Sequence, residues 1–465
     1  MLLLADWVIP VSSAPLADAG VRVMDGRIDE VGPAAQLRAR YQGEEERTFP
    51  GCALLPGFVN SHSHLELSAF RGFARPSGFG RWMLNLLMAR RKLDKDDYGP
   101  SALWGAYEAA RCGITSLGDT AYDGLAVARA VAAAGLRARV YQEVFGLDDD
   151  SLPRTMERYE AVMARLREEA DAAPRDPGGL ALVEAGVSPH APYTVSVRLY
   201  HEAARFARRA GLRVATHVAE SAAEVQVLAR GSGPIARAYR LAQLWTGASW
   251  APPRMRPVEY VAASGALSPE TLVIHAVEVD AGEVGMLARS GAPVAHCPRS
   301  NARLHCAAAP VAEYLEAGIT VGLGTDSLSS NDSLDMFAEM RAALAAAESR
   351  VETGASPGGR LSPEAVLRMA TIEGARALGW EEATGSLETG KSADIIAVRV
   401  RDGGGAASPV DGLVGAATAD DVRLTMVAGR VVFAATAESG GPEVYPPASI
   451  LEGYQAVRRK LGLKG

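Results

Sequence analysis

Eight short apolar runs recur between residues 53 and 325, and helical patterns fill the intervals between them. Strands that alternate with helices in this way form parallel sheets, because right-handed crossovers return the chain to the same edge. Eight such units are the number that closes a (β/α)8 barrel. We therefore expect an α/β protein with a TIM-like barrel, whose strands should span residues 53–60, 114–119, 138–145, 181–187, 213–218, 271–277, 293–297 and 320–325.

Both ends of the chain carry short segments in which apolar and polar residues alternate. Apolar and polar residues alternate on both sides of Asp25 and Gly26 within residues 21–31, and an Asp-Gly pair is typical of a hairpin turn. A similar strand-like pattern returns in residues 393–398 and 424–433. The two ends are therefore expected to pair with each other. The predicted organisation is a composite β-sandwich domain from residues 1–50 and 385–440, a barrel from 51–384, and a C-terminal helical tail over 441–465.

The composition of the chain limits which kinds of partner and which cellular compartment are expected. A formal net charge of -7 over 465 residues leaves no basic surplus to neutralise nucleic-acid phosphates. The sequence also has neither an 18-residue apolar run free of charge nor a leader with a basic flank. We expect a cytoplasmic protein that binds a small molecule and neither nucleic acid nor a membrane, with a homodimer left open.

Ionisable residues stand where several of the predicted strands end. His62 and His64 follow the first run two positions apart, so that both imidazoles leave a strand on one face, although such pairs also occur in ordinary loops and cores. His217 ends the fifth run and Asp326 follows the eighth. Three imidazoles and a carboxylate form a plausible ligand set for Zn²⁺ or Fe²⁺, which would lower the pKa of a bound water from about 15.7 toward about 7.

Two of these assignments have ordinary structural alternatives. Asp326 follows a glycine-rich stretch, where an aspartate often binds its own backbone in a turn. Glu220 lies three residues after His217, close enough to carry a proton, but it also suits the N-terminus of a helix that begins near residue 221. Agreement with the three histidines favours the catalytic interpretation of both carboxylates.

The order of the motifs resembles that of the amidohydrolase superfamily, in the branch that holds adenosine-type, S-adenosylhomocysteine and guanine deaminases and triazine chlorohydrolases. The resemblance covers essentially the whole chain. It rests on His275 and on the stretches PGFVNSHSH (56–64), SPHAPYT (188–194), THVAE (216–220), HCPRSNARL (296–304), GLGTDSLSSN (322–331) and GSLETGKSADI (385–395).

The resemblance implies a role for each matched residue. His62, His64, His217 and Asp326 match metal ligands, with Asp326 also accepting a proton from the attacking water. Glu220 matches the proton shuttle, and His275 matches the residue that orients the hydroxide. His190, which follows the fourth predicted strand, matches a histidine that holds substrate.

The number of metal ions follows from where lysine is missing. Superfamily members with two metals place a carboxylated lysine on the fourth strand, and this chain has no lysine between Lys95 and Lys391. We therefore expect one divalent ion, with zinc favoured and iron open.

Four further residues are expected to contact the substrate. Glu66 directly follows the histidine pair, Trp82 lies in an aromatic and arginine-containing region over residues 71–82, and Ser330 and Asn331 end the GLGTDSLSSN stretch. The HSHLELS stretch with Phe79 and Trp82 looks similar to aminodeoxyfutalosine deaminases of the menaquinone route. The insertion at residues 231–260 has no assigned role.

The function implied is hydrolytic deamination of a 6-aminopurine nucleoside, with hydroxide attacking the amino-bearing ring carbon and ammonia leaving. Aminodeoxyfutalosine or another 5′-substituted adenosine is the favoured substrate. A guanine- or triazine-type amino- or chlorohydrolase on the same scaffold is the first alternative. A non-catalytic binding protein is the second, and it is disfavoured because the whole ligand set is present.

Overall fold

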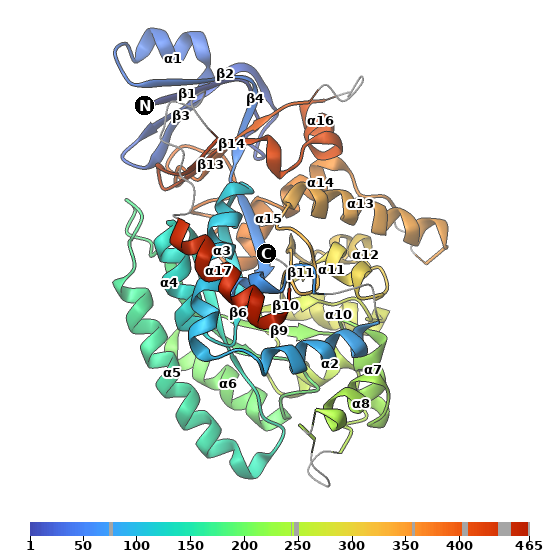
Figure 1. Cartoon of the computed structure of the whole chain (residues 1–465). Coiled ribbons are helices and arrows are strands. Elements are labelled where there is room, and N and C mark those ends of the chain that lie inside the picture. The colour runs from blue at the N-terminus through green and yellow to red at the C-terminus, as the bar shows by residue number, and fades with distance from the viewer. Residues whose placement is uncertain are drawn as a thin grey trace.

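The computed structural model describes residues 1–73, 78–242, 244–245, 251–355, 359–401, 408–435 and 448–463. Within these residues the strands form an eight-stranded parallel sheet and a separate seven-stranded mixed sheet. The parallel sheet forms the predicted (β/α)8 barrel. The mixed sheet gathers strands from both chain ends at one end of the molecule, so the expected architecture is confirmed (Figure 1).

The barrel strands are fully or almost fully buried, as expected for parallel strands covered by helices. Their order in the sheet follows the chain. They are β5 (Phe58–Ser63), β6 (Ile114–Ala121), β7 (Arg137–Val144), β8 (Val183–Pro189), β9 (Val214–Val218), β10 (Thr271–His275), β11 (Val294–His296) and β12 (Val321–Leu323).

Helices follow the strands, and several begin at a Ser or Asp side chain that accepts from a backbone N–H of the first turn. The helices of the barrel and its loops are α2 (Phe79–Arg90), α3 (Tyr98–Arg111), α4 (Gly124–Ala134), α5 (Leu152–Ala172), α6 (Val197–Ala210), α7 (Ala222–Arg230), α8 (Pro234–Leu241), α9 (Pro257–Ala263), α10 (Ala281–Ser290), α11 (Pro298–Arg303), α12 (Val311–Glu316), α13 (Met336–Glu352), α14 (Pro363–Met369) and α15 (Ile372–Leu378). Short 3-10 turns are η1 (Leu65–Phe70), η2 (Lys95–Asp97), η3 (Asp149–Ser151) and η5 (Ala419–Asp421).

Side chains alternate between the two faces of each strand. In β7, Val140 and Val144 pack in the large core that includes the helices outside the barrel. Tyr141 instead packs in the smaller core that contains residues of α15. Because strand neighbours alternate, Glu143 shares the inner face with Tyr141 and lies nearer the carboxyl end of the barrel.

The first barrel strand differs from the predicted span of 53–60. Residues 53–56 belong to β4 (Glu46–Pro56), which pairs with β1 and β13 in the mixed sheet, and the barrel strand begins at Phe58. Gly57 lies between the two strands. A Cβ atom at this position would lie 2.1 Å from the side chain of Thr115, so a larger residue would clash there. One apolar run thus serves two sheets, and its apolar residues alone do not reveal the break.

The barrel closes between its first and last strands. Thr325 and Asp326 follow β12, and their backbone N–H groups donate to the carbonyl of His62 at 3.1 and 3.0 Å. The Asn60 side chain donates to Thr325 Oγ1 at 2.8 Å and accepts from Thr325 N at 3.0 Å. A bridge between Ser63 and Asp326 completes this contact, which we call the closure seam.

The mixed sheet packs its own apolar core from both chain ends, with Leu54, Ile395 and Leu424 among the buried residues. In sheet order its strands are β15 (Arg430–Ala434), β14 (Val422–Val427), β13 (Ile395–Arg399), β4, β1 (Leu2–Val8), β2 (Leu16–Met24) and β3 (Arg27–Pro33). Helix α1 (Ala34–Arg40) packs against it, whereas α16 (Pro409–Ala416) packs against α13 and α14 of the barrel.

A C-terminal helix, α17 (Ala448–Leu461), packs against η1 and α3, beside the segment that follows the histidine pair (Figure 1). The Arg458 guanidinium donates to the carbonyls of Ala69 and Arg71. Among the described helices, none combines the length and the apolar character that a membrane span needs.

A buried ion pair joins the barrel to the mixed sheet. Arg137 on β7 donates to Asp394 at 3.3 Å and to Asp176 at 3.1 Å, and the side chains of Arg137 and Asp394 are fully buried. Removing one partner of such a pair leaves a charge without compensation in a place that water does not reach.

We therefore expect Arg137→Ala to lower the free energy of unfolding by about 3–5 kcal/mol, measured by urea denaturation. Arg129→Ala is the matched control, because Arg129 binds Glu169 in an exposed ion pair that is worth less than about 1 kcal/mol. Equal losses for the two variants would contradict a special role for the buried pair.

Candidate metal centre and active site

The predicted metal ligands converge at the carboxyl end of the barrel. The Nε2 atoms of His64 and His217 are 3.3 Å apart. Asp326 Oδ1 lies 3.4 Å from His62 Nε2 and 3.7 Å from His64 Nε2. Ligand atoms of the three histidines all lie within 4.8 Å of one another, so a single ion can reach them.

The three imidazoles are in the neutral form that binds metals. Burial, followed by the unfavourable interaction with a protonated His62, lowers the pKa of His64 to about 3, and burial and His64 lower that of His217 to about 4. Both ring nitrogens of His62 are buried, and within the described residues neither has a hydrogen-bond partner. Unpartnered nitrogen atoms on neutral imidazoles beside a carboxylate fit a divalent cation.

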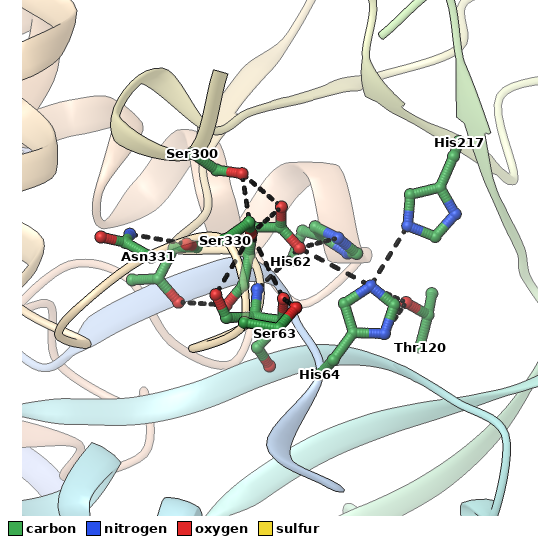
Figure 2. A network of polar contacts seen from close by, with 12 residues as sticks. His62, Ser63, His64, Thr120, His217, Ser300, Ser330 and Asn331 are labelled. Carbon is green, nitrogen blue, oxygen red and sulfur yellow. Dashed lines mark hydrogen bonds and ion pairs between the residues drawn. The ribbon is translucent and has the colours of Figure 1, made fainter. Parts of the chain in front are cut away.

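Neighbouring groups orient these rings. The Nδ1 atom of His217 lies 3.1 Å from the carbonyl of His190, which can only accept, so Nδ1 carries the proton and Nε2 is left for a metal. The Thr120 hydroxyl lies 3.3 Å from both ring nitrogens of His64 (Figure 2). The carbonyl of His190 thus selects the nitrogen of His217 that faces the centre, and Thr120 packs beside the ring of His64.

Asp326 is held as an anion. Burial raises its pKa, but the electrostatic interaction with His62 at 3.4 Å and with the other nearby histidines outweighs that effect and keeps the pKa well below its usual range. The hydroxyls of Ser300 and Ser330 both donate to Oδ2, leaving Oδ1 toward the histidines (Figure 2).

Glu220 and His275 face each other beside Asp326. Glu220 Oε1 lies 3.5 Å from His275 Nε2, and the ligand atoms of these two residues and Asp326 all lie within 4.8 Å of one another. Burial, then Asp326 and Glu224, raise the pKa of Glu220 well above its usual value, so that it can hold a proton at neutral pH. The Asn301 amide approaches His275 Nδ1 at 3.2 Å.

The backbone is left-handed at four non-glycine positions of this rim. The φ angles are 55° at Ala219, 75° at His275, 46° at Ala276 and 58° at Asp326. Such conformations cost about 1–3 kcal/mol each and concentrate at functional sites. Here they lie at or beside the residues whose side chains converge.

The five residues that were predicted to bind substrate occupy different kinds of position in the structure. His190 stands beside the metal ligands, with its ring 5.0 Å from that of His217. Glu66 is buried, and its carboxylate accepts from Tyr122 N at 3.1 Å and Asp123 N at 2.8 Å. Its ion pair with Arg90, at 3.4 Å, uses the same carboxylate. This placement favours a supporting role for Glu66 over direct contact with substrate.

The remaining three act on the loop after β12. Trp82 Nε1 donates to the carbonyl of Ser329 at 3.0 Å, which ties α2 to that loop. Ser330 binds the Asp326 carboxylate, as described above. The Asn331 amide donates to the carbonyl of Thr325 at 2.8 Å and to Glu339 at 2.7 Å. These contacts position Asp326.

Sequence reasoning missed several residues of the site. Ser300 and Asn301 lie inside the quoted HCPRSNARL stretch, so their motif was a usable signal. Thr120 and Glu143 stand near the carboxyl ends of β6 and β7 without any motif, and only their position at those ends pointed to the site.

The chain matches known proteins over most of its length. Residues 53–432 match the amidohydrolase family. The 5-methylthioadenosine/S-adenosylhomocysteine deaminase of Moorella thermoacetica is 33% identical, and the match covers 92% of each chain. The 5′-deoxyadenosine deaminase of Methanothermobacter thermautotrophicus is 32% identical, over 84% of this chain and 85% of that protein.

Solved structures resemble the fold. An adenosine deaminase from Xanthomonas campestris with bound zinc superposes with a TM-score of 0.81 at 25% identity, covering 99% of this chain and 98% of that one. The aminofutalosine deaminase of Helicobacter pylori superposes with a TM-score of 0.77 at 22% identity, covering 92% and 99%. At that lower identity the likeness establishes the fold alone.

Metal analysis tests the ligand set. We expect purified protein to hold about one divalent ion per chain, since no lysine can bridge a second, and His62→Ala to lose both the ion and the activity. His201→Ala on the surface of α6 is the control and should keep both. Two tightly bound ions, both required for activity, would contradict this arrangement.

Proposed function

This chain belongs to the amidohydrolase family, and on that premise we propose that it deaminates adenosine-type nucleosides that carry a modified 5′ carbon. It is a hydrolase acting on C–N bonds, and relatives that match most of its length are named as deaminases of 5-methylthioadenosine, S-adenosylhomocysteine and 5′-deoxyadenosine. The observation that carries the proposal is the joint presence of these relatives and a converged cluster of histidines and carboxylates.

His62, His64, His217 and Asp326 would hold one divalent ion. Zinc is favoured over iron, since three neutral imidazoles and a carboxylate suit it and leave a position for water. When bound, the ion supplies a water molecule activated for attack near neutral pH.

The protein residues around the proposed metal site would transfer protons during the reaction. Glu220, whose pKa burial raises well above its usual value, can donate a proton to the purine ring nitrogen next to the amino-bearing carbon as water adds to that carbon. Asp326 can accept the proton that the water gives up, and a proton carried to the amine lets it leave as ammonia. His275 orients the attacking oxygen, because Asn301 fixes its ring through Nδ1.

Two exposed aromatic rings support a modified 5′ carbon. Tyr122 and Phe145 are 55% and 38% exposed, with ring centroids 6.5 Å apart. Phe145 also lies 4.7 Å from the ring of His190. An apolar 5′ substituent can pack on this pair, whereas a free 5′ hydroxyl gains nothing there.

Aminodeoxyfutalosine, and with it a place in menaquinone biosynthesis, is a narrower form of the proposal. It needs a cation for the substrate carboxylate. Arg71 is bound to Glu108 and Arg90 to Glu66, Arg75 lies outside the described residues, and Arg81 is exposed on α2. The structure therefore offers less support for this substrate than for an uncharged 5′ substituent.

Ammonia release across a substrate panel tests the proposal. We expect kcat/KM for 5′-methylthioadenosine to exceed that for adenosine by about tenfold or more, equivalent to about 1.4 kcal/mol in transition-state binding. S-adenosylhomocysteine, 5′-deoxyadenosine and aminodeoxyfutalosine complete the nucleoside arm. Efficient turnover of guanine or a chlorotriazine, with no turnover of any adenine nucleoside, would contradict the proposed substrate class.

Glu220→Gln tests the proton shuttle. The variant keeps the size of the side chain but cannot exchange a proton, so kcat should fall at least about 10²-fold while the metal content stays unchanged. Glu202→Gln, on the surface of α6, should have normal kcat. Near-normal turnover by Glu220→Gln would remove this residue from the mechanism.

A further inference from the structure

Glu143 is a buried carboxylate that the proposed reaction does not use. It lies at the carboxyl end of β7 on the inner face of the barrel, and only 3% of its side chain is exposed. Within the described part of the chain, its Oε1 atom has no hydrogen-bond partner. An unmet buried acceptor destabilises the fold, so a ligand that donates to it offers a reason for its presence.

Glu143 approaches His190, whose Nε2 atom lies 3.9 Å from Oε1. This distance is too long for a hydrogen bond. The ligand atoms of Glu143, His190 and His217 nevertheless all lie within 4.8 Å of one another, which places Glu143 beside the metal ligands.

The contacts of His190 determine which of its nitrogens can accept. Its Nδ1 atom lies 2.8 Å from the Thr194 hydroxyl oxygen, and that hydroxyl donates its only proton to the carbonyl of Ala191. In this arrangement Nδ1 donates to Thr194, and Nε2 is left to accept. Glu143 Oε1 and His190 Nε2 thus face each other across a gap that no direct hydrogen bond spans.

A second metal ion is a poor occupant for this gap. His217 would have to be the third ligand, but its Nδ1 atom bonds to the carbonyl of His190 and its Nε2 atom faces His64. Only Glu143 and His190 would remain, fewer than the three or four protein ligands that metal sites of this kind use.

The charge around Glu143 favours a donor that is not an anion. Burial and the charge of Glu66, partly offset by Arg90, raise the pKa of Glu143 to about 8, and Arg90 itself pairs with Glu66 at 3.4 Å. Because Arg90 is already paired with Glu66, it offers little attraction to an anion that enters beside Glu143.

We propose that Glu143 and His190 form an acceptor pair that binds the two sugar hydroxyls of the nucleoside. This inference rests on the proposed function. Glu220, His275 and Asp326 form a separate cluster on the other side of the metal histidines, and the amino-bearing ring carbon must reach that side. The sugar hydroxyls are then the donors left for Glu143 and His190, and the 5′ carbon points toward Tyr122 and Phe145 at the rim.

Comparing two substrates tests the role of Glu143. We expect Glu143→Gln to lower kcat/KM for adenosine by about ten- to a hundredfold, the range for disturbing the hydrogen bonding of a buried polar group, mainly through KM. For 2′,3′-dideoxyadenosine, which lacks both hydroxyls, the same variant should stay within about twofold of the wild type. Glu143→Ala provides a second variant with the same expectation. Glu184→Gln is the control, because Glu184 pairs with Arg139 near the opposite end of the barrel.

Equal losses on both substrates, or no loss on adenosine, would overturn the proposal, with metal content and melting temperature confirming that each variant is folded. The wild-type enzyme separates this question from the proposed function. Deamination of adenosine by the wild type upholds that function whatever the variants do. Failure of the wild type to deaminate any adenine nucleoside defeats both.

Discussion

The closure seam between β5 and the end of β12 is the contact on which the site depends. Two backbone N–H groups, from Thr325 and Asp326, donate to the carbonyl of His62, and Asn60 holds Thr325 from the side. The hydrogen bonds that close the barrel therefore also fix the spacing between a histidine and the carboxylate that faces it. Closing the barrel therefore also positions His62 and Asp326 in the candidate metal centre.

The three histidines of the candidate metal centre adjoin two clusters of residues. Glu220, His275 and Asp326 form the cluster to which the proposed reaction assigns proton transfer, and Glu143 with His190 form the cluster proposed to bind the sugar hydroxyls. His217 lies between them, since its Nδ1 proton is taken by the carbonyl of His190 while Nε2 faces the centre. A substrate with an amine at one end and hydroxyls at the other can satisfy both clusters at once.

The sequence predicted the barrel and the ligand set because both leave periodic signals: apolar runs at regular intervals and polar residues where they end. It placed the first strand too early, since the apolar run through Pro56 does not mark the break at Gly57. It expected Glu66 at the mouth, but the turn η1 directs this carboxylate toward the N–H groups of residues 122 and 123. Glu143 carried no signal, because its significance lies in an unpaired oxygen that only three-dimensional packing reveals.

The left-handed residues of the rim are stabilised by contacts between neighbouring loops. Ala276 N donates to the carbonyl of Val218 at 3.0 Å, and Val277 N donates to that of Ala219 at 2.9 Å. The Glu224 carboxylate accepts from Ala219 N and from Glu220 N. These bonds offset the backbone strain at Ala219 and His275 and hold Glu220 toward His275 without help from a substrate. Charged and polar groups that are fixed in this way lose little energy to reorganisation during a reaction, which is the condition under which they stabilise a transition state most effectively.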